Sequence, residues 1–444
     1  MKKLILLLTI LIFELGLKAQ SPTVTSWLQN TTITGRYYNS GNSTPQNSSD
    51  LVNVQSVYYN TNYAFVSATG IPAYITGPFL DGNPSVATAQ NNIFKVPLNP
   101  TQNSGTATAT GMGNIGVFIN GTALFSYADG VSWNPATNAL CGGPGNPPCP
   151  GGPGATQDWN RDAIPAEMGG FDCSKGHPAM GNYHHHQNPS AFKLDLTVLS
   201  NICNLYDADG LYAIDSTVHS PLIGFAYDGY PIYGAYSYAN TNGTGGIVRM
   251  KSSYSLSGAT TRTNGPNVNA TYFDGYFRED YQYTPPTSSD YLDDHNGRFC
   301  ITPEYPSGTY CYFATVDENW NSAYPYAVGP TFYGNVDVTT VNSIPGGATQ
   351  YITSIDENQL DNVSINIYPN PANDFIVMQI NALVKESIDV ELFDITGKII
   401  QKSIIYPGST ITHLDTRSLY NGQYIVRFTS NNKTVVKKVM ITKD

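Results

Sequence analysis

The sequence has 444 residues, with 22 basic and 33 acidic side chains and a net charge of -11 at pH 7. Because proteins that bind phosphate backbones need basic surfaces, this charge argues against nucleic acid as a partner. The length suits two to three domains, and the 32 tyrosines, 41 glycines and 29 prolines favour strands joined by turns. We therefore predict an all-β protein.

The first 19 residues have the pattern of a secretory signal peptide. Lys2 and Lys3 form a basic start, residues 4–13 are apolar, and Ala19 supplies a small residue for cleavage. The apolar run is too short to cross a bilayer. We expect the mature chain to be exported and to have no transmembrane segment.

Residues 20–106 are polar, with short alternating segments that prolines interrupt. This pattern predicts a β-rich region packed on a central domain at 107–335, rather than an independent domain. The central domain is expected to consist of hairpins and long loops. Its first hairpin is indicated by Asn120-Gly121 between two apolar runs, because the central positions of such a tight turn need positive φ.

Six cysteines lie in the central region, and in an exported chain they favour disulfides, although six cysteines allow 15 pairings. Two pairs have local support. Cys141 and Cys149 bracket a Gly/Pro-rich loop, and Cys300 and Cys311 flank a turn between two expected strands. The remaining pair would be Cys173 with Cys203. Thiolates that bind a metal are the less favoured alternative.

Four of the seven histidines fall within residues 176–187. If 184–186 is a strand, side chains alternate, so His184 and His186 share one face and His185 lies on the other. His177 could supply a third imidazole from the preceding segment. Several convergent imidazoles are typical of metal sites. The alternative is a half-exposed strand whose histidines only form hydrogen bonds.

Other polar side chains lie near the ends of expected strands, where loops gather functional groups on a rigid frame. His219, His295 and Asp228 are candidates to complete the histidine site or to support its ligands. Asp228, Glu304 and Glu318 are candidate general bases for a metal-bound water, although carboxylates at turns usually cap backbone amides. Three nitrogen ligands with an open position suit zinc, and tetragonal histidine sites suit copper, so the expected cofactor is one of these metals.

The segment 183–186, Tyr-His-His-His, resembles the signature of the YHYH family, with His185 in place of the second tyrosine. Further segments resemble the family in the same order: 116–121, 172–173, 176–178, 219–234, 296–299, 302–306 and 308–310. The resemblance implies a YHYH-type domain at 107–335. It implies no particular reaction.

Residues 336–364, rich in Thr, Ser and Gly, are expected to form an extended linker. Residues 365–444 are expected to form an Ig-like β-sandwich of about seven short strands. This last segment resembles the type A C-terminal sorting domain of the type IX secretion system at 368–371, 392–394, 422–424 and 437–441. The resemblance implies that the type IX machinery is a partner and that the protein is secreted or held at the outer cell surface.

Two functions are compatible with these features. The first is a metalloprotein that binds one transition metal through His177, His184 and His186 and acts as a metal-dependent hydrolase or oxidoreductase. The second is a cell-surface binding or adhesion module, for a glycan or another protein, in which the histidines are structural. A surface rich in tyrosine and asparagine would suit a glycan, because aromatic rings stack on sugars.

Overall fold

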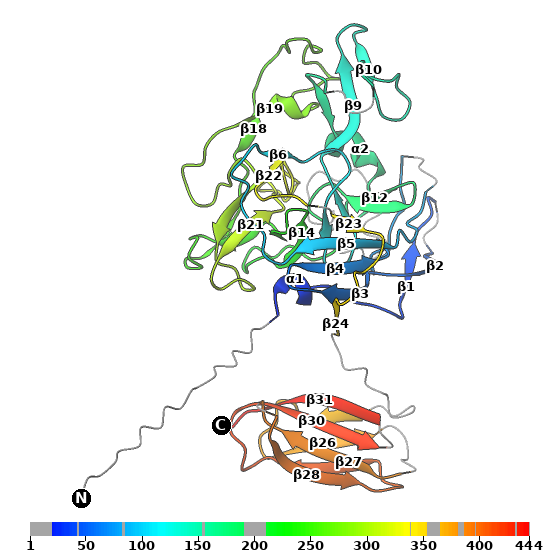
Figure 1. The fold of residues 1–444 in the computed structure, drawn as a ribbon, viewed down its shortest axis with the longest axis vertical. Helices are drawn as coiled ribbons and strands as arrows, with labels where there is room; N and C mark the ends of the chain where they lie inside the picture. The colour runs from blue at the N-terminus through cyan, green and yellow to red at the C-terminus, as the bar shows by residue number, and fades with distance from the viewer. Residues whose placement is uncertain are drawn as a thin grey trace, which may run out of the picture. The chain divides into compact units, whose positions relative to one another are not determined.

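The computed structural model divides the chain into two compact units, residues 1–351 and 352–444, and each is described by itself (Figure 1). The predicted all-β class is confirmed, since strands far outnumber the short helices. The predicted signal peptide lies outside the described residues. The structure describes residues 20–41, 44–81, 85–152, 156–190, 210–337, 339–352, 365–380, 386–395, 397–430 and 433–443.

An eight-stranded sheet carries the histidine segment. The run 222–226 is apolar throughout, as expected of a strand buried on both faces, and it pairs with β7 on one side and β15 on the other. In hydrogen-bonded order the strands are β12 (Gly176–Ala179), β13 (Asn182–His185), β8 (Ala123–Phe125), β7 (Asn114–Phe118), β14 (Leu222–Ala226), β15 (Pro231–Tyr233), β21 (Thr309–Phe313) and β20 (Gly297–Cys300).

The hairpin predicted from Asn120-Gly121 is confirmed, because β7 and β8 pair in antiparallel fashion around this turn. Gly121 has a φ of 79°. Asn120 does not take up positive φ; its side chain instead accepts a hydrogen bond from the backbone N–H of Thr122 at 3.1 Å. The turn therefore uses glycine for the backbone and asparagine for a side-chain cap.

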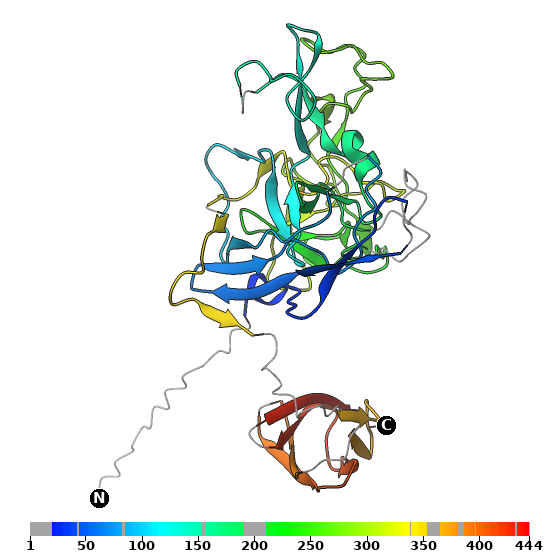
Figure 2. The same cartoon turned by 90° about the vertical axis from the view of Figure 1, so that its right-hand side faces the viewer.

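A five-stranded sheet forms a second layer of the first unit. Figure 2 shows its blue strands side by side, with the yellow strand β24 along one edge. The order is β23 (Thr340–Val341), β5 (Asn92–Pro97), β4 (Tyr63–Ala68), β3 (Val54–Tyr59) and β24 (Thr349–Tyr351).

The prediction of an extended linker at 336–364 is wrong for the first half of this segment. Strands β23 and β24 lie within it and pair with β5 and β3, so the first unit extends to Tyr351. Thr340 and Thr349 are β-branched residues that fit a sheet edge, although the surrounding Ser, Gly and Gln favoured a linker. Residues 353–364 lie outside the described part of the chain.

The two sheets share one hydrophobic core. Val54 and Val66 of the five-stranded sheet belong to the same buried cluster as Val117 and Phe225 of the eight-stranded sheet. All four are fully buried, and burying one such side chain stabilises the fold by about 2 kcal/mol. The histidine strand β13 is therefore paired into a sheet with a rigid, packed core.

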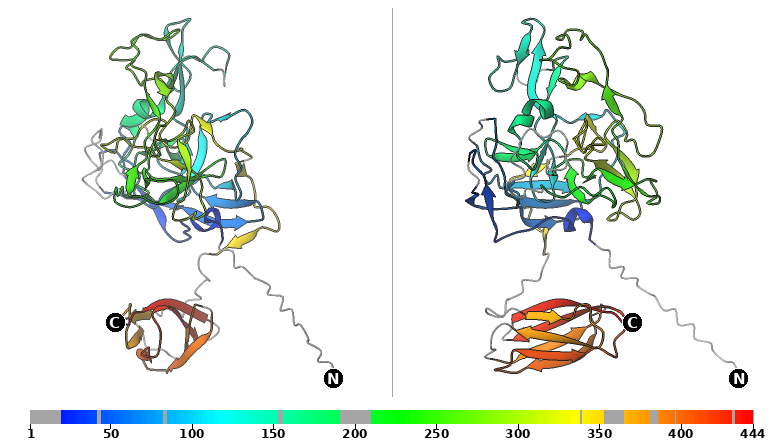
Figure 3. Two further views of the ribbon diagram at one scale, coloured as in Figure 1. Left: turned by 90° about the vertical axis from the view of Figure 1, so that its left-hand side faces the viewer. Right: turned by 180° about the vertical axis from the view of Figure 1, so that it is seen from behind.

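The strand β9 (Ala128–Asn134) pairs with both β10 (Ala139–Cys141) and β11 (Asn160–Asp162). Figure 3 shows the cyan hairpin of β9 and β10 at one end of the first unit. The predicted bridge between Cys141 and Cys149 is confirmed, with an S–S distance of 2.08 Å. It closes the Gly/Pro-rich loop that follows β10.

The pairing of the other four cysteines differs in part from the predicted pairing. Cys300 and Cys311 are buried free thiols, so the bridge expected between them is not formed. Cys311 lies opposite Arg298 in the β20–β21 register, so the two cysteines are diagonal neighbours rather than direct partners. Cys173 is disulfide-bonded, and its predicted partner Cys203 lies outside the described residues.

The remaining elements in the described part of the first unit are short. The helices are α1 (Pro22–Thr25), α2 (Ala163–Glu167), η1 (Met168–Gly170) and η3 (Arg278–Asp280). The strands are β1 (Thr34–Tyr37), β2 (Gln46–Leu51), β6 (Thr108–Ala109), β16 (Tyr236–Tyr238), β17 (Ile247–Arg249), β18 (Tyr254–Leu256), β19 (Tyr281–Tyr283) and β22 (Thr331–Phe332).

The second unit is a β-sandwich, as predicted, with a three-stranded sheet (β25, β26, β29) and a four-stranded sheet (β28, β27, β30, β31). Ile376, Val390 and Phe428 from the two sheets are fully buried in one core. The strands are β25 (Ile365–Tyr368), β26 (Phe375–Ile380), β27 (Ile388–Phe393), β28 (Ile399–Ile405), β29 (Ile411–Asp415), β30 (Gly422–Ser430) and β31 (Lys433–Ile441).

Candidate metal centre

Three imidazoles from one hairpin face a common point. His177 lies directly opposite His184 in the β12–β13 register, and His186 follows the end of β13. One ligand nitrogen from each lies within 4.8 Å of the others. The predicted convergence is confirmed. The three residues are only 8%, 2% and 4% exposed, so the interpretation as a half-exposed strand is wrong.

His185 belongs to a different network on the other face of the strand, as the alternation predicted. Its Nε2 atom lies 2.7 Å from the Tyr74 hydroxyl. The Tyr183 ring packs against it edge-on, with ring centres 5.3 Å apart. The extra imidazole of this sequence therefore fills a buried pocket lined by tyrosines and is no part of the cluster.

Backbone carbonyls fix the tautomers of two of the clustered histidines. The Nδ1 atom of His184 lies 2.9 Å from the carbonyl oxygen of Asn182, and the Nδ1 atom of His186 lies 2.5 Å from that of Ser126. A carbonyl only accepts, so each Nδ1 carries hydrogen and each neutral ring has its lone pair on Nε2. These two Nε2 atoms are 3.1 Å apart. Two lone pairs at that distance repel unless a cation lies between them.

A carboxylate that the sequence reasoning missed lies beside two of the three imidazoles. Glu167, the last residue of α2, places Oε2 3.2 Å from Nε2 of His177 and 3.1 Å from Nε2 of His186. A tetrahedral zinc ion with bonds of about 2.1 Å spaces its donor atoms about 3.4 Å apart. The two distances from Glu167 approach that spacing, while the group whose ligand atoms all lie near one another consists of His177, His184 and His186.

The short helix α2 positions Glu167. Asp162 caps the helix by accepting a hydrogen bond from the backbone N–H of Ile164 at 2.9 Å. The second carboxylate oxygen of Asp162 accepts from the Tyr326 hydroxyl at 2.6 Å. Burial raises the pKa of Asp162 to about 7. This capped, buried helix start fixes the end from which Glu167 extends.

The protonation states of the residues in the cluster depend on one another. Burial alone would raise the pKa of Glu167, but hydrogen bonds from His177 and His186 outweigh it and hold the pKa far below its usual range. Burial also lowers the pKa of His184, and the neighbouring imidazoles lower it further. The pKa of His186 is raised because the hydrogen bond and charge of Glu167 outweigh burial. The cluster therefore pairs one anionic carboxylate with a positive charge on or between the imidazoles.

Two phenylalanines shield the imidazoles. Phe125 of β8 stacks on His184 with ring centres 3.8 Å apart and planes 18° apart. Phe171 packs edge-on against His177 at 4.9 Å. Aromatic walls lower the local dielectric and strengthen electrostatic contacts at the cluster. The Glu167 side chain is 27% exposed, so it is the solvent-facing member.

Asp172 organises the start of the hairpin. Its carboxylate accepts backbone hydrogen bonds from Gly77 and Ser174, both at 2.9 Å, and from Gly176 at 3.2 Å. It also accepts from the Tyr183 hydroxyl at 2.9 Å. A side chain at Gly176 would overlap the Tyr183 ring, which explains the glycine before His177.

The other predicted histidine ligands lie elsewhere. Nδ1 of His219 is 2.7 Å from the Ser220 carbonyl oxygen, and its Nε2 is 3.1 Å from the Ser237 hydroxyl. Nδ1 of His295 is 2.7 Å from the Thr331 hydroxyl. Across the described residues, the group of potential metal ligands contains neither of them. The prediction that they complete the site is therefore wrong; each is hydrogen-bonded to residues outside the cluster.

The three predicted general bases are also not brought to the cluster. Asp228 is fully buried and accepts from the Tyr312 hydroxyl at 2.5 Å, so it cross-links the fold. Glu304 accepts from the Tyr233 hydroxyl at 2.7 Å. The Glu318 side chain is 78% exposed. These carboxylates follow the capping and surface roles that turn residues usually have.

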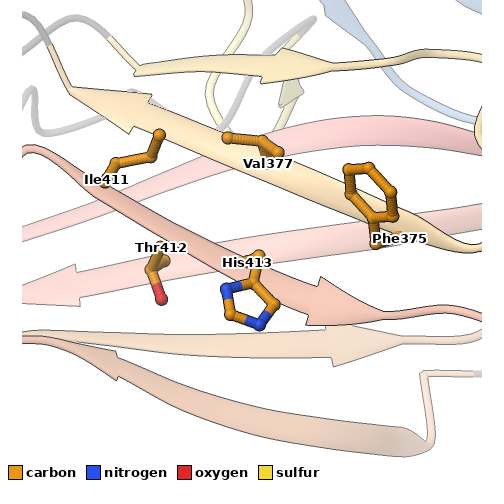
Figure 4. Close-up of a pocket in the computed structure, with 5 residues that line it drawn as sticks. All are labelled: Phe375, Val377, Ile411, Thr412 and His413. Carbon is orange, nitrogen blue, oxygen red and sulfur yellow. The ribbon is translucent and has the colours of Figure 1, made fainter.

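The second unit has a shallow apolar hollow over β26 and β29. Figure 4 shows Phe375, Val377, Ile411, Thr412 and His413 around it. His413 pairs in register with Val377, and the other lining residues, Phe375, Val377, Ile411 and Thr412, include no further charged or metal-ligating side chain. The hollow therefore offers no set of ligands comparable with the histidine cluster.

Comparison with known proteins gives the family of each unit. No curated protein sequence matches the chain. A family described as secretion system C-terminal sorting domain matches residues 366–442, which indicates export by the type IX system to the cell surface or beyond. Across the described residues, no helix is both long and apolar enough to span a membrane. The family described as YHYH protein matches residues 93–325, more than half of the chain, and the protein therefore belongs to the YHYH family.

Proposed function

We propose that this exported protein binds one divalent transition metal ion through Nε2 of His177, His184 and His186, with Glu167 as a fourth ligand. One observation carries the proposal. The Nε2 atoms of His184 and His186 face each other at 3.1 Å while both Nδ1 atoms are held by backbone carbonyls. Histidines that bind metals are held in this way, with the second ring nitrogen donating to a carbonyl or carboxylate.

A shared proton is the simplest competing explanation for the close nitrogens. A proton could bridge His184 and His186, and Glu167 would balance its charge. That arrangement needs only two imidazoles, whereas His177 also directs Nε2 to the same point, 3.2 Å from the carboxylate. Three convergent imidazoles with a carboxylate beside two of them favour a metal ion, because a single proton cannot satisfy them.

The donor set favours zinc or copper. Three imidazoles and one carboxylate are borderline ligands, and no thiolate belongs to the group formed by the described residues. Such an ion would lower the pKa of a bound water or, for copper, exchange one electron. The Glu167 side chain is the most exposed of the four, at 27%, although its Oε2 atom is buried, so a water or substrate would reach the ion by displacing this carboxylate. We propose a metal-dependent hydrolase or oxidoreductase on this basis.

Metal analysis of the purified full chain tests the proposal. After loading with zinc or copper and dialysis, we expect about one equivalent of metal per chain. The variant His184→Ala/His186→Ala should lose it, and His413→Ala, in the other unit, should retain it. Less than about 0.1 equivalent in the folded wild-type protein would overturn the proposal, because sites with several histidines bind these ions tightly. Circular dichroism of each protein confirms that it is folded.

A further inference from the structure

We propose that the first unit has a second binding site, a groove that takes a neutral oligosaccharide. It is independent of the metal site. The groove consists of two adjoining cavities of about 380 and 350 Å³, which share Asn99 and Pro100 in their walls. Each volume is within the range of ligand cavities, roughly 300–1,000 Å³. We call these two cavities the aromatic groove.

The aromatic groove lies far from the histidines in the sheet. Phe299 of β20 and Tyr310 of β21 line its first cavity, together with Tyr230, which directly precedes β15. In the sheet order, β20 and β21 are at the opposite end from β12 and β13. Loss of the metal site should therefore leave the groove intact.

The first cavity has rigid aromatic walls. Tyr310 and Tyr333 stack with ring centres 3.6 Å apart and planes 3° apart. Tyr230 packs edge-on against both rings, at 5.5 and 5.3 Å, and its hydroxyl donates to the carbonyl of Pro100. Tyr230 and Tyr310 are buried, at 7% and 2% exposed, and they hold the half-buried Tyr333 in place. Tyr333 therefore offers a fixed aromatic surface at little cost in conformational entropy.

One wall residue is largely exposed. Phe299 is 61% exposed, whereas its neighbours on β20, Arg298 and Cys300, are buried. Exposing a phenylalanine ring to water costs free energy that ligand contact would recover. A ring beside the tyrosine wall is suited to stack on the C–H face of a sugar.

Charge restricts the ligand class. No charged side chain lines the first cavity. In the second, the carboxylate of Asp337 is 2.7 Å from Lys95, and the other acidic group, Asp228, is buried and accepts from Tyr312. With a net charge of -11 on the chain, acidic polymers are repelled.

Polar groups beside the rings can form hydrogen bonds with the hydroxyl groups of a sugar. Asn99 and Thr309 are among the residues that line the first cavity, and Asn62 and Asn335 are among those that line the second. Amide and hydroxyl groups both donate and accept hydrogen bonds, as sugar hydroxyls do. Uncharged hydrogen-bonding groups next to flat rings favour a neutral oligosaccharide over a peptide, whose amides need directed backbone partners.

Calorimetric titration of the full chain with a defined panel tests this site. The panel comprises cellohexaose, laminarihexaose, mannohexaose, hexagalacturonate and a proline-rich decapeptide. We expect at least one of the three neutral hexaoses to bind and the acidic chain and the peptide not to bind. Absence of binding to all three neutral hexaoses at millimolar concentration, or preference for the acidic chain or the peptide, overturns the proposal.

A pair of variants locates the binding. Phe299→Ala should weaken binding of the neutral hexaose about tenfold or more, which is about 1.4 kcal/mol. Phe273→Ala removes another exposed phenylalanine, 40% exposed, and should leave the affinity unchanged. Equal affinity in wild type and Phe299→Ala would overturn the groove as the site. The His184→Ala/His186→Ala variant should bind the sugar normally, which separates this inference from the metal proposal.

Discussion

The carboxylate of Glu167 lies 3.1 Å from Nε2 of His186, although the two residues come from different elements. Glu167 ends a five-residue helix, and His186 leaves the strand β13. The same oxygen reaches His177 on the adjacent strand. The site is thus closed by tertiary packing of a helix end against a hairpin, not by the hairpin alone.

Replacement of this carboxylate should weaken metal binding without abolishing it. Glu167→Gln keeps the shape of the side chain but removes the anionic ligand, while the three imidazoles remain. We expect zinc affinity to fall about 10- to 100-fold or more, since even supporting groups of metal sites contribute that much. Competition with a chromophoric chelator measures the change. Glu304→Gln, which alters a carboxylate bonded to Tyr233, is the matched control and should keep wild-type affinity.

The metal-free protein should lose stability as the pH rises above neutrality. The pKa of His186 in the folded state is raised above its unfolded value of about 6.5, because Glu167 holds the charged form. Stability from this proton is complete below about pH 6.5 and is lost as the pH rises through the folded pKa. His184 affects stability only at acidic pH. Its pKa is lowered in the folded state, so the unfolded state takes up the proton first and the stability falls as the pH drops below about 6.5.

Thermal unfolding of wild type and His186→Gln between about pH 6 and 9 tests this sign. The difference in Tm between the two proteins should shrink as the pH rises. The comparison is needed because Asp162, with a pKa of about 7, adds a decrease of its own in both proteins. A difference that does not change with pH would contradict the assignment. Zinc affinity should show the opposite trend and rise with pH, because the ion displaces the proton.

Much of the site could be predicted from local patterns. Period-two alternation placed His184 and His186 together and His185 opposite, and the glycine turn after Asn120 gave the neighbouring hairpin. These are properties of residues close in sequence. They need no knowledge of how distant segments pack.

The parts that the sequence did not reveal depend on distant segments. Glu167 carries no local signal, because its role arises only when α2 packs beside the hairpin. His219 and His295 are at strand ends, as expected, but the sheet order brings those ends to other places. Strands β23 and β24 were hidden in a polar segment because their partners, β5 and β3, lie far earlier in the chain.

Asp172 should be among the most sensitive positions for stability. Asp172→Ala would leave buried backbone N–H groups of Gly77, Ser174 and Gly176 without their acceptor. An unsatisfied buried group costs about 1–3 kcal/mol, so we expect a loss of at least 3 kcal/mol in the free energy of unfolding. Tyr183→Phe removes a single donor and should cost about 1 kcal/mol. Urea denaturation of both variants measures the difference, and equal losses would contradict this account.

Substitutions of the adjacent residues His184 and His185 should have different effects on zinc loading and on stability. His184→Asn removes a ligand and should reduce zinc loading well below one equivalent, with a minor change in fold. His185→Asn leaves the ligands in place but loses the contact with the Tyr74 hydroxyl at 2.7 Å in a fully buried pocket. We expect this variant to load zinc fully and to lose about 1–3 kcal/mol of stability. Zinc content by mass spectrometry and urea denaturation separate the two effects. Loss of zinc in His185→Asn while the protein stays folded would show that the imidazole on the far face supports the ligands, contrary to the two-network arrangement.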